Sequence, residues 1–354
     1  KYWHPICNVG DLWQTLQKSK SSTDRTAQAM PNKVIDFHVH SLEPQVFKAS
    51  TNKTVFTGFG ANPVTEPRPG AQALLQRMFQ PHTILEDMDA RGIDMSVVTS
   101  STVLQGTSWA DIELDLSLCQ CCNDQVAAWQ AQYPNRFVGS MVLPLQDVNK
   151  AMQELKRAHE SLGLRVVNVS SSYKGIYLGD AIYDSFWQEV ASRQLVVWIH
   201  PEGVNDPWFQ QYSLWNSLGQ SIEETKCMAS LIYGGVMARY PDLKVVIAHG
   251  GGYFPHYLGR LDRNAVNRPD TVKHLGGKAP RDFLKHFYYD TCVYDPAVLK
   301  ALIALVGTDR LVMGSDYPVG EKDPVAWLRD AGLSGDALSA VAGGNAANLL
   351  GMTT

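Results

Sequence analysis

Short apolar runs rich in Val, Ile, Phe and Tyr recur along the chain, and longer segments with helical periodicity separate them. Each run is long enough for a buried strand and too short for a buried helix. We therefore predict eight strands, at residues 34–40, 95–101, 137–144, 164–170, 195–200, 244–250, 286–292 and 310–316.

The segments between the runs carry the signals of helix boundaries. TILEDMDARG ends at Gly92, DVNKAMQELKRAHESLG ends at Gly163, and DPAVLKALIALVG opens with Asp-Pro and ends at Gly307. Pro is favoured in the first turn of a helix, and Gly is favoured just past its end. Strands that alternate with helices form parallel βα units, and eight such units make a (β/α)8 TIM barrel.

One α/β barrel over residues 34–354 is favoured over two domains, because no linker rich in Pro, Gly or Ser interrupts the series. A doubly wound sheet is the main alternative fold. However, HGGGYFPH lacks the glycine order of a dinucleotide-binding turn, and no acidic residue ends a suitable second strand. Residues 1–33 are expected to form an N-terminal arm, and residues 57–70 an extended loop over the barrel mouth.

The composition of the chain argues against two classes of binding partner. The net charge is −4 and no dense run of Lys or Arg occurs, so neither nucleic acid nor an anionic membrane surface is expected as a partner. No apolar run approaches the ~20 residues of a membrane span, and the first residues do not resemble a secretory signal.

Six cysteines are too few and too irregular for a disulfide framework, so a cytoplasmic location is expected. CQCC at 119–122 is interpreted as ordinary helix packing.

Histidines and a carboxylate mark the ends of several predicted strands. His38 and His40 share one face of the first strand, because side chains two residues apart point to the same side. The fifth, sixth and eighth strands end at His200, His249 and Asp316. A lone histidine at a strand end is more often structural. The hypothesis of a metal site therefore depends on the fact that four of the ten histidines lie at predicted strand ends. In a closed barrel these groups converge at the mouth and suit a divalent ion such as Zn, Mn or Fe.

The same residues, together with DLKVVIAHGGGYFPHYLGRLDR and FYYDTCVYDPAVLKALIALVGTDRLVMGSDYP, resemble the amidohydrolase superfamily. The narrower resemblance is to its amidohydrolase-2 branch, typified by aminocarboxymuconate-semialdehyde decarboxylases. This resemblance implies that the metal ligands are His38, His40, His200 and Asp316. LRVVNVS on the fourth strand has no lysine, so the carbamylated lysine that bridges two metals in other members cannot form there. A single ion is the simpler expectation, with Zn as the first choice.

The resemblance also implies roles outside the ligand set. His249 is expected to act as the acid/base, and Asp316 belongs to the catalytic residues as well as to the ligands. Arg260 is expected to reach the site of a neighbouring subunit and bind a substrate carboxylate, which implies a homodimer. Trp215 matches the place of an aromatic wall of the substrate site.

One family residue is absent. The resemblance places a second substrate-binding arginine in the loop after the first strand, but Thr57 occupies that position, with Lys53 and Arg68 nearby as substitutes. A lost or displaced positive charge implies that the natural substrate is a different acid from aminocarboxymuconate semialdehyde.

We therefore expect a metal-dependent decarboxylase of a small unsaturated or aromatic carboxylic acid. The alternative is a metal-dependent hydrolase of a lactone, amide or C–C bond in a similar acid, and hydration or oxidative chemistry stays open. A structural metal-holding subunit is disfavoured, because an acid/base histidine beside an incomplete ligand set is typical of an open catalytic site.

Overall fold

The computed structural model describes residues 33–50, 53, 71–100, 107–201 and 207–352. Its main sheet has eight strands, and their order in the sheet is their order along the chain. All neighbouring strands pair in parallel. The strands are β1 (Ile35–Ser41), β2 (Met95–Ser100), β3 (Phe137–Val142), β4 (Val166–Ser170), β7 (Val196–His200), β8 (Lys244–Ile247), β9 (Phe287–Asp290) and β10 (Leu311–Val312).

The first strand closes the sheet against the segment that follows the last one. The backbone N–H of Phe37 donates to the carbonyl of Met313 at 2.8 Å, and that of Tyr317 donates to the carbonyl of His38 at 3.1 Å. Val39 and Tyr317 form a parallel bridge. The sheet is therefore a barrel, and the predicted (β/α)8 fold is confirmed.

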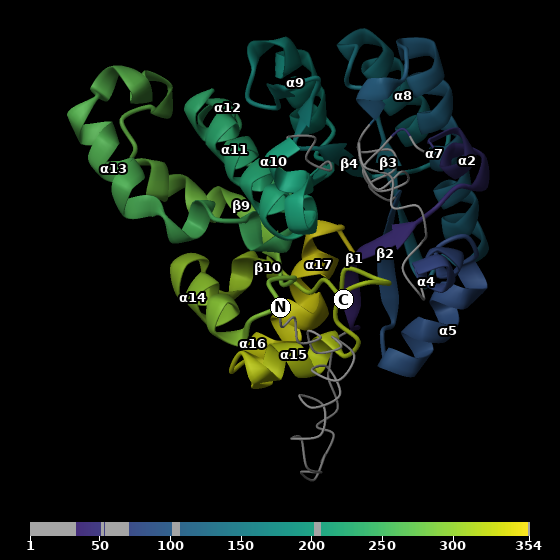
Figure 1. Cartoon of the computed structure of the whole chain (residues 1–354). Coiled ribbons are helices and arrows are strands. Elements are labelled where there is room, and N and C mark those ends of the chain that lie inside the picture. The colour runs from purple at the N-terminus through teal and green to yellow at the C-terminus, as the bar shows by residue number, and fades with distance from the viewer. Residues whose placement is uncertain (1–32, 51–52, 54–70, 101–106, 202–206, 353–354) are drawn as a thin grey trace, which may run out of the picture. The chain divides into compact units, whose positions relative to one another are not determined.

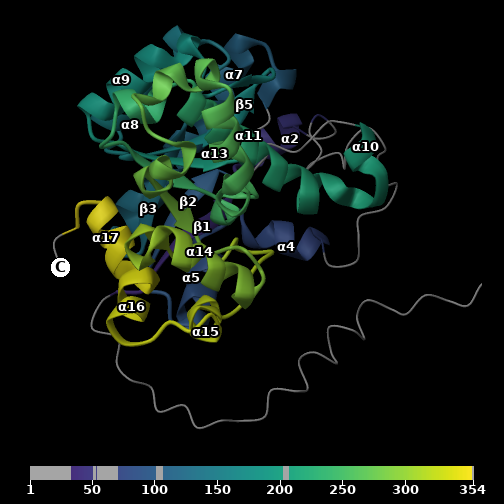
Figure 2. The same cartoon turned by 90° about the vertical axis from the view of Figure 1, so that its left-hand side faces the viewer.

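Helices lie around the outside of this barrel (Figures 1 and 2). They are α2 (Pro44–Ser50), α4 (Ala71–Arg77), α5 (Pro81–Arg91), α7 (Ile112–Gln132), α8 (Val148–Glu160), α9 (Asp184–Ser192), α10 (Pro207–Gln210), α11 (Gln220–Tyr233), α12 (Val236–Arg239), α13 (Leu258–Asn267), α14 (Pro296–Val306), α15 (Pro324–Asp330), α16 (Gly335–Ser339) and α17 (Asn345–Leu349). A short hairpin, β5 (Ser172–Tyr173) with β6 (Ile176–Tyr177), follows β4.

Local sequence signals explain several of these boundaries. Gly92 follows α5 with φ 67°, a conformation that side chains with a Cβ rarely adopt. The Asp295 side chain accepts hydrogen bonds from two backbone N–H groups in the first turn of α14. The predicted helix boundaries at these positions are confirmed.

The cysteine cluster lies within α7, as the helical periodicity predicts. Cys119 and Cys122 are buried in an apolar cluster with Leu42, Val46 and Leu118. The interpretation of CQCC as helix packing is therefore confirmed. Among the described helices, none is long and apolar enough to cross a bilayer.

Some of the predictions fall on segments outside the described residues. These are the N-terminal arm up to residue 32, the loop at 57–70, and Arg68 within that loop. The roles assigned to them stay predictions.

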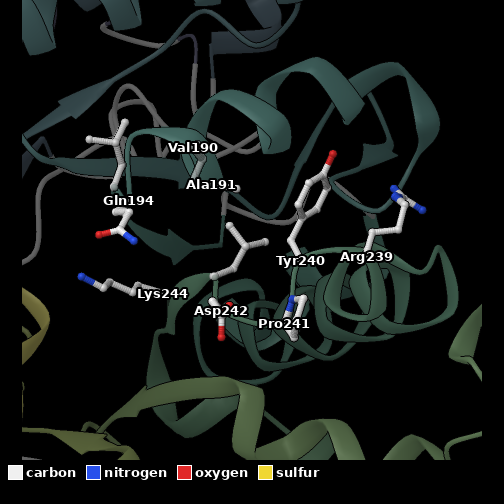
Figure 3. A pocket seen from close by; sticks show the side chains of 10 residues that line it. Val190, Ala191, Gln194, Arg239, Tyr240, Pro241, Asp242 and Lys244 are labelled. Atoms are coloured by element: carbon white, nitrogen blue, oxygen red, sulfur yellow. The ribbon is translucent and has the colours of Figure 1, made fainter.

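A pocket lined partly by charged residues lies at the amino ends of the barrel strands. Gln194, Arg239, Asp242 and Lys244 line it, and Lys244 is the first residue of β8 (Figure 3). Its described lining contains neither histidine nor cysteine. In TIM barrels this face contributes to stability, whereas catalytic residues lie at the carboxyl ends of the strands.

Candidate active site

The histidines of β1 meet Asp316 at the carboxyl end of the barrel. His38 Nε2 and His40 Nε2 lie 3.2 Å apart, and Asp316 Oδ1 lies 3.0 Å from His40 Nε2 and 3.3 Å from His38 Nε2. One ligand atom from each of His38, His200, His249 and Asp316 lies within 4.8 Å of the others. The structure thus brings together all five side chains that the strand pattern singled out.

Two of the five lie beyond their strands. β8 ends at Ile247 and β10 at Val312, whereas His249 opens a short 3-10 turn and Asp316 lies four residues past its strand. Both residues have left-handed backbones, with φ 48° and φ 55°. Such conformations are uncommon for residues other than glycine and concentrate at functional sites. The prediction that His249 and Asp316 end strands is therefore wrong, because sharp turns outside the ladder set their direction.

Three of the four imidazoles have a hydrogen-bond partner on the side away from the cluster, and two of these three lie on strands. His38 Nδ1 donates to Asp290 Oδ2 at 2.7 Å, and His200 Nδ1 donates to the carbonyl of Pro201 at 3.0 Å. Such outer partners fix the tautomer and direct Nε2 inward as a ligand atom. His40 Nδ1 has no partner within the described part of the chain.

His249, which is partly buried, pairs with the buried Glu224 of α11. Its Nδ1 donates to Glu224 Oε1, and the Glu224 side chain is fully buried. Burial alone lowers the pKa of His249, but the charge of Glu224 and the hydrogen bond to it raise that pKa to about 10. Because Nδ1 is engaged, Nε2 is the nitrogen left to face the cluster.

Gly252 makes this pairing possible. A Cβ at Gly252 would lie 2.2 Å from the carbonyl oxygen of Ser221 and 3.1 Å from Glu224 Oε2. Its φ of 61° is also one that residues with side chains rarely adopt. The glycine run after β8 thus lets α11 approach closely enough for Glu224 to reach His249.

The protonation states suit a divalent cation. Burial opposes the charged form of Asp316, but His38 and His40 hold the pKa of its carboxyl well below the usual range. Burial lowers the pKa of His40, and burial with the neighbouring histidines lowers that of His200 well below its ordinary value. Neutral imidazoles beside an anionic carboxylate form a donor set that fits zinc, manganese or iron.

A cavity opens onto this cluster. It is lined by His40, His200, His249, Asp316, Met78, Trp215, Asn216, Gln220, Pro318 and Val319. Trp215 begins a π-helical turn (Trp215–Gly219), a form that is rare and frequent at functional sites. The Asn216 Nδ2 group donates to Gln220 Oε1 at 3.0 Å, which places an amide pair beside the indole. The cavity wall combines apolar surface with a few polar groups, as ligand sites do.

Two of the other predicted substrate residues, Arg260 and Lys53, do not belong to the described lining of this cavity. Arg260 is exposed on α13, in a separate pocket with Gly259, Arg263 and Asn264. Lys53 is also absent from the described lining.

The structure adds residues that the sequence interpretation left without a role. Asp290 ends β9, so the strand-end rule that found His200 also applies to it. Glu224, Asn216 and Gln220 lie on α11 or the turn before it, and acidic or amide residues on a helix are usually solvated. No local signal distinguishes these three.

Known proteins resemble this chain in sequence and fold. A 2-amino-3-carboxymuconate-6-semialdehyde decarboxylase of Dictyostelium discoideum is 32% identical over 278 residues, which cover 77% of each chain. The crystal structure of 5-carboxyvanillate decarboxylase from Sphingomonas paucimobilis is 26% identical, with TM-score 0.79 and coverage of 91% of this chain and 99% of that one. A dihydroxybenzoic acid decarboxylase from Polaromonas sp. JS666, solved with bound manganese, is 23% identical, with TM-score 0.78 and coverage of 90% and 97%.

The model of the amidohydrolase family matches residues 35–352, which is nearly the whole barrel. The chain therefore belongs to the amidohydrolase family, and the resemblance drawn from its motifs is confirmed.

Proposed function

We propose that this protein is a metal-dependent carboxy-lyase that releases CO2 from a small unsaturated or aromatic carboxylic acid. The observation that carries the proposal is the cluster of His38, His40, His200 and Asp316, with the separately oriented pair of His249 and Glu224 beside it. The three relatives named above are all decarboxylases of such acids, which supports this reaction over the alternatives.

The proposed metal ligands are His38, His40, His200 and Asp316, and they would hold one divalent ion. Zinc is the first choice and manganese or iron the alternatives, and manganese is bound in the Polaromonas relative. A divalent ion at this place supplies positive charge that attracts the substrate's carboxylate and stabilises charge that develops during the reaction.

His249 is the proposed proton donor. Glu224 accepts from Nδ1 and its charge favours the imidazolium form of His249, so Nε2 also carries a proton. Nε2 would deliver this proton to the substrate carbon that bears the carboxylate, which leaves neutral His249 with its remaining proton on Nδ1. That carbon becomes tetrahedral, the bond to the carboxylate breaks, and its electron pair restores the unsaturated system as CO2 leaves. His249 then regains a proton from solvent. The apolar side chains of Met78, Pro318 and Val319 line the cavity beside the cluster and offer a surface for the apolar part of the substrate.

Hydrolysis of a lactone, amide or C–C bond is the weaker candidate. The same cluster suits it chemically, but the three relatives described above are decarboxylases. A panel of unsaturated and aromatic acids, incubated with metal-loaded protein and assayed for CO2, tests the proposal. Release of CO2 from at least one acid is expected, and hydrolysis products without CO2 would contradict it.

Glu224→Gln is expected to lower kcat and to shift the pH profile. The amide carries no charge, so the pKa of His249 falls in the variant, because the charge of Glu224 is what raises it. His249 then loses its proton at a lower pH, and the basic limb of the kcat profile moves to lower pH. A pH–rate series measures this shift. Glu223→Gln is the control, since Glu223 bonds Tyr177 rather than His249; equal profiles for wild type and Glu224→Gln would remove the assigned role.

Arg260 is the proposed contact between subunits. It is exposed on α13 and lies outside the cavity of its own chain, and the exposed apolar residues Tyr257 and Val266 lie on or beside the same helix. This arrangement supports a homodimer in which Arg260 reaches the partner's cavity and binds the substrate carboxylate. The dimer and the cytoplasmic location stay predictions.

Arg260→Ala is expected to raise KM for an anionic substrate about 10- to 100-fold, because a hydrogen bond to a charged group contributes about 1.5–3 kcal/mol. Steady-state kinetics measure the change, and sedimentation checks that the dimer persists. Arg263→Ala removes the same charge one turn further along α13 and is the matched control. Unchanged KM in Arg260→Ala, or an equal rise in Arg263→Ala, would contradict the assignment.

A further inference from the structure

Tyr294 contacts Asp316, a member of the cluster of histidines and carboxylate, from the loop between β9 and α14. Its hydroxyl donates to Asp316 Oδ2 at 2.5 Å. The other oxygen of the same carboxylate, Oδ1, faces His40 Nε2 at 3.0 Å and His38 Nε2 at 3.3 Å. The two oxygens of Asp316 are therefore divided between the tyrosine and the histidines.

Unusual backbone conformations and backbone hydrogen bonds fix the position of both residues of this contact. Tyr294 and Asp316 both have left-handed backbones, with φ 54° and φ 55°. The carbonyl of Asp316 accepts from the N–H of Val319 at 2.9 Å and of Gly320 at 2.8 Å. A Cβ at Gly320 would lie 2.8 Å from the Tyr294 hydroxyl and 2.8 Å from Asp316 Cβ. Gly320 therefore leaves the space in which the hydroxyl meets the carboxylate.

Core packing does not account for Tyr294. Tyr294 is 49% exposed as a residue, whereas Asp316 is only 9% exposed. A tyrosine that served mainly to fill the interior would be buried as a whole, but here a half-exposed residue directs its hydroxyl to a buried carboxylate. The polar contact is thus the feature that the local structure preserves.

We propose that Tyr294 is a positioning residue that makes Asp316 a ligand through Oδ1 alone. This inference rests on the proposed metal site. Because the hydroxyl donates to Oδ2, it disfavours rotation of the carboxylate to present both oxygens, so Asp316 would offer an ion Oδ1 and leave a position there for an oxygen of the substrate. Tyr294 thereby acts on Asp316 as Asp290 acts on His38, through a hydrogen bond from outside the ligand set.

Tyr294→Phe tests this role, because it removes only the hydroxyl. Each protein is stripped with a chelator and titrated with Mn²⁺ against a chromophoric competitor, and the electron paramagnetic resonance spectrum of bound Mn²⁺ is recorded. Loss of an outer partner typically weakens metal binding about 10- to 100-fold. We expect that rise in Kd for Tyr294→Phe, together with a changed Mn²⁺ spectrum. Tyr177→Phe is the matched control, since the Tyr177 hydroxyl donates to the carboxylate of Glu223 at 2.7 Å, away from the cluster.

Thermal unfolding of the metal-free proteins separates positioning from a structural role. The proposal expects at most a small fall in Tm without metal, from the lost hydrogen bond, and a larger fall relative to wild type when Mn²⁺ is added. A Kd within twofold of wild type would overturn it, as would a fall in the metal-free Tm equal to the fall with metal. The readouts need no substrate, so a failed decarboxylation assay leaves them valid. Wild-type protein that binds no metal would overturn this inference and the proposed function together.

Discussion

His200→Ala is expected to yield a folded protein that retains almost no metal and has no measurable decarboxylase activity. His200 ends β7, is 2% exposed and presents Nε2 to the cluster, because its Nδ1 bonds the carbonyl of Pro201. Removal of a ligand should weaken binding by more than the ~10- to 100-fold that loss of an outer hydrogen bond causes. Elemental analysis of the purified variant and a CO2 assay measure both effects.

His159→Ala is the control for this variant. His159 lies on α8 and bonds the carbonyl of Leu164, away from the cluster. Circular dichroism of both variants checks that the barrel still folds. Full metal content in His200→Ala would remove His200 from the ligand set.

His249→Ala is expected to behave differently, with metal content retained and kcat reduced about 10²- to 10⁴-fold, the usual contribution of general acid/base catalysis. The reason is that Nδ1 of His249 is engaged by Glu224, which leaves Nε2 to serve the substrate. Metal analysis and steady-state kinetics on the same preparation separate the two quantities.

This variant matters because geometry alone allows a second interpretation. A ring nitrogen of His249 lies within 4.8 Å of ligand atoms of His38, His200 and Asp316, so His249 could itself bind the ion. Loss of metal from His249→Ala would favour that role over acid/base catalysis. His82→Ala, on the exposed side of α5, should leave both metal and kcat unchanged.

The barrel could be predicted from the sequence because its strands are nearly continuous apolar runs, as expected for a parallel sheet buried on both faces. All eight predicted runs contain the observed strands or most of them. The predicted strands extend past the observed carboxyl ends of β8 and β10. There the chain keeps an apolar composition but leaves the ladder through turns at His249 and Asp316, and composition does not encode that change.

The candidate site could be predicted as far as its inner side chains. His38, His40 and His200 lie on strands, so periodicity alone gives their direction. The outer partners were missed for physical reasons. Glu224 reaches His249 from a helix 25 residues earlier in the chain, and Tyr294 reaches Asp316 from a loop 22 residues away. Such contacts depend on tertiary structure, and no spacing rule connects the residues. Asp290 is the exception, because it ends a strand.

The central claim is that His38, His40, His200 and Asp316 hold an ion at which a carboxyl group is replaced by a proton. Turnover in D2O tests it most directly, with an acid that the panel identifies and with mass spectrometry of the product. The account predicts one CO2 per turnover and one deuterium on the vacated carbon. Both should disappear after chelation and return when Zn²⁺ or Mn²⁺ is added. Product that has gained the elements of water and retains its carboxyl group, or turnover that survives complete metal removal, would contradict it.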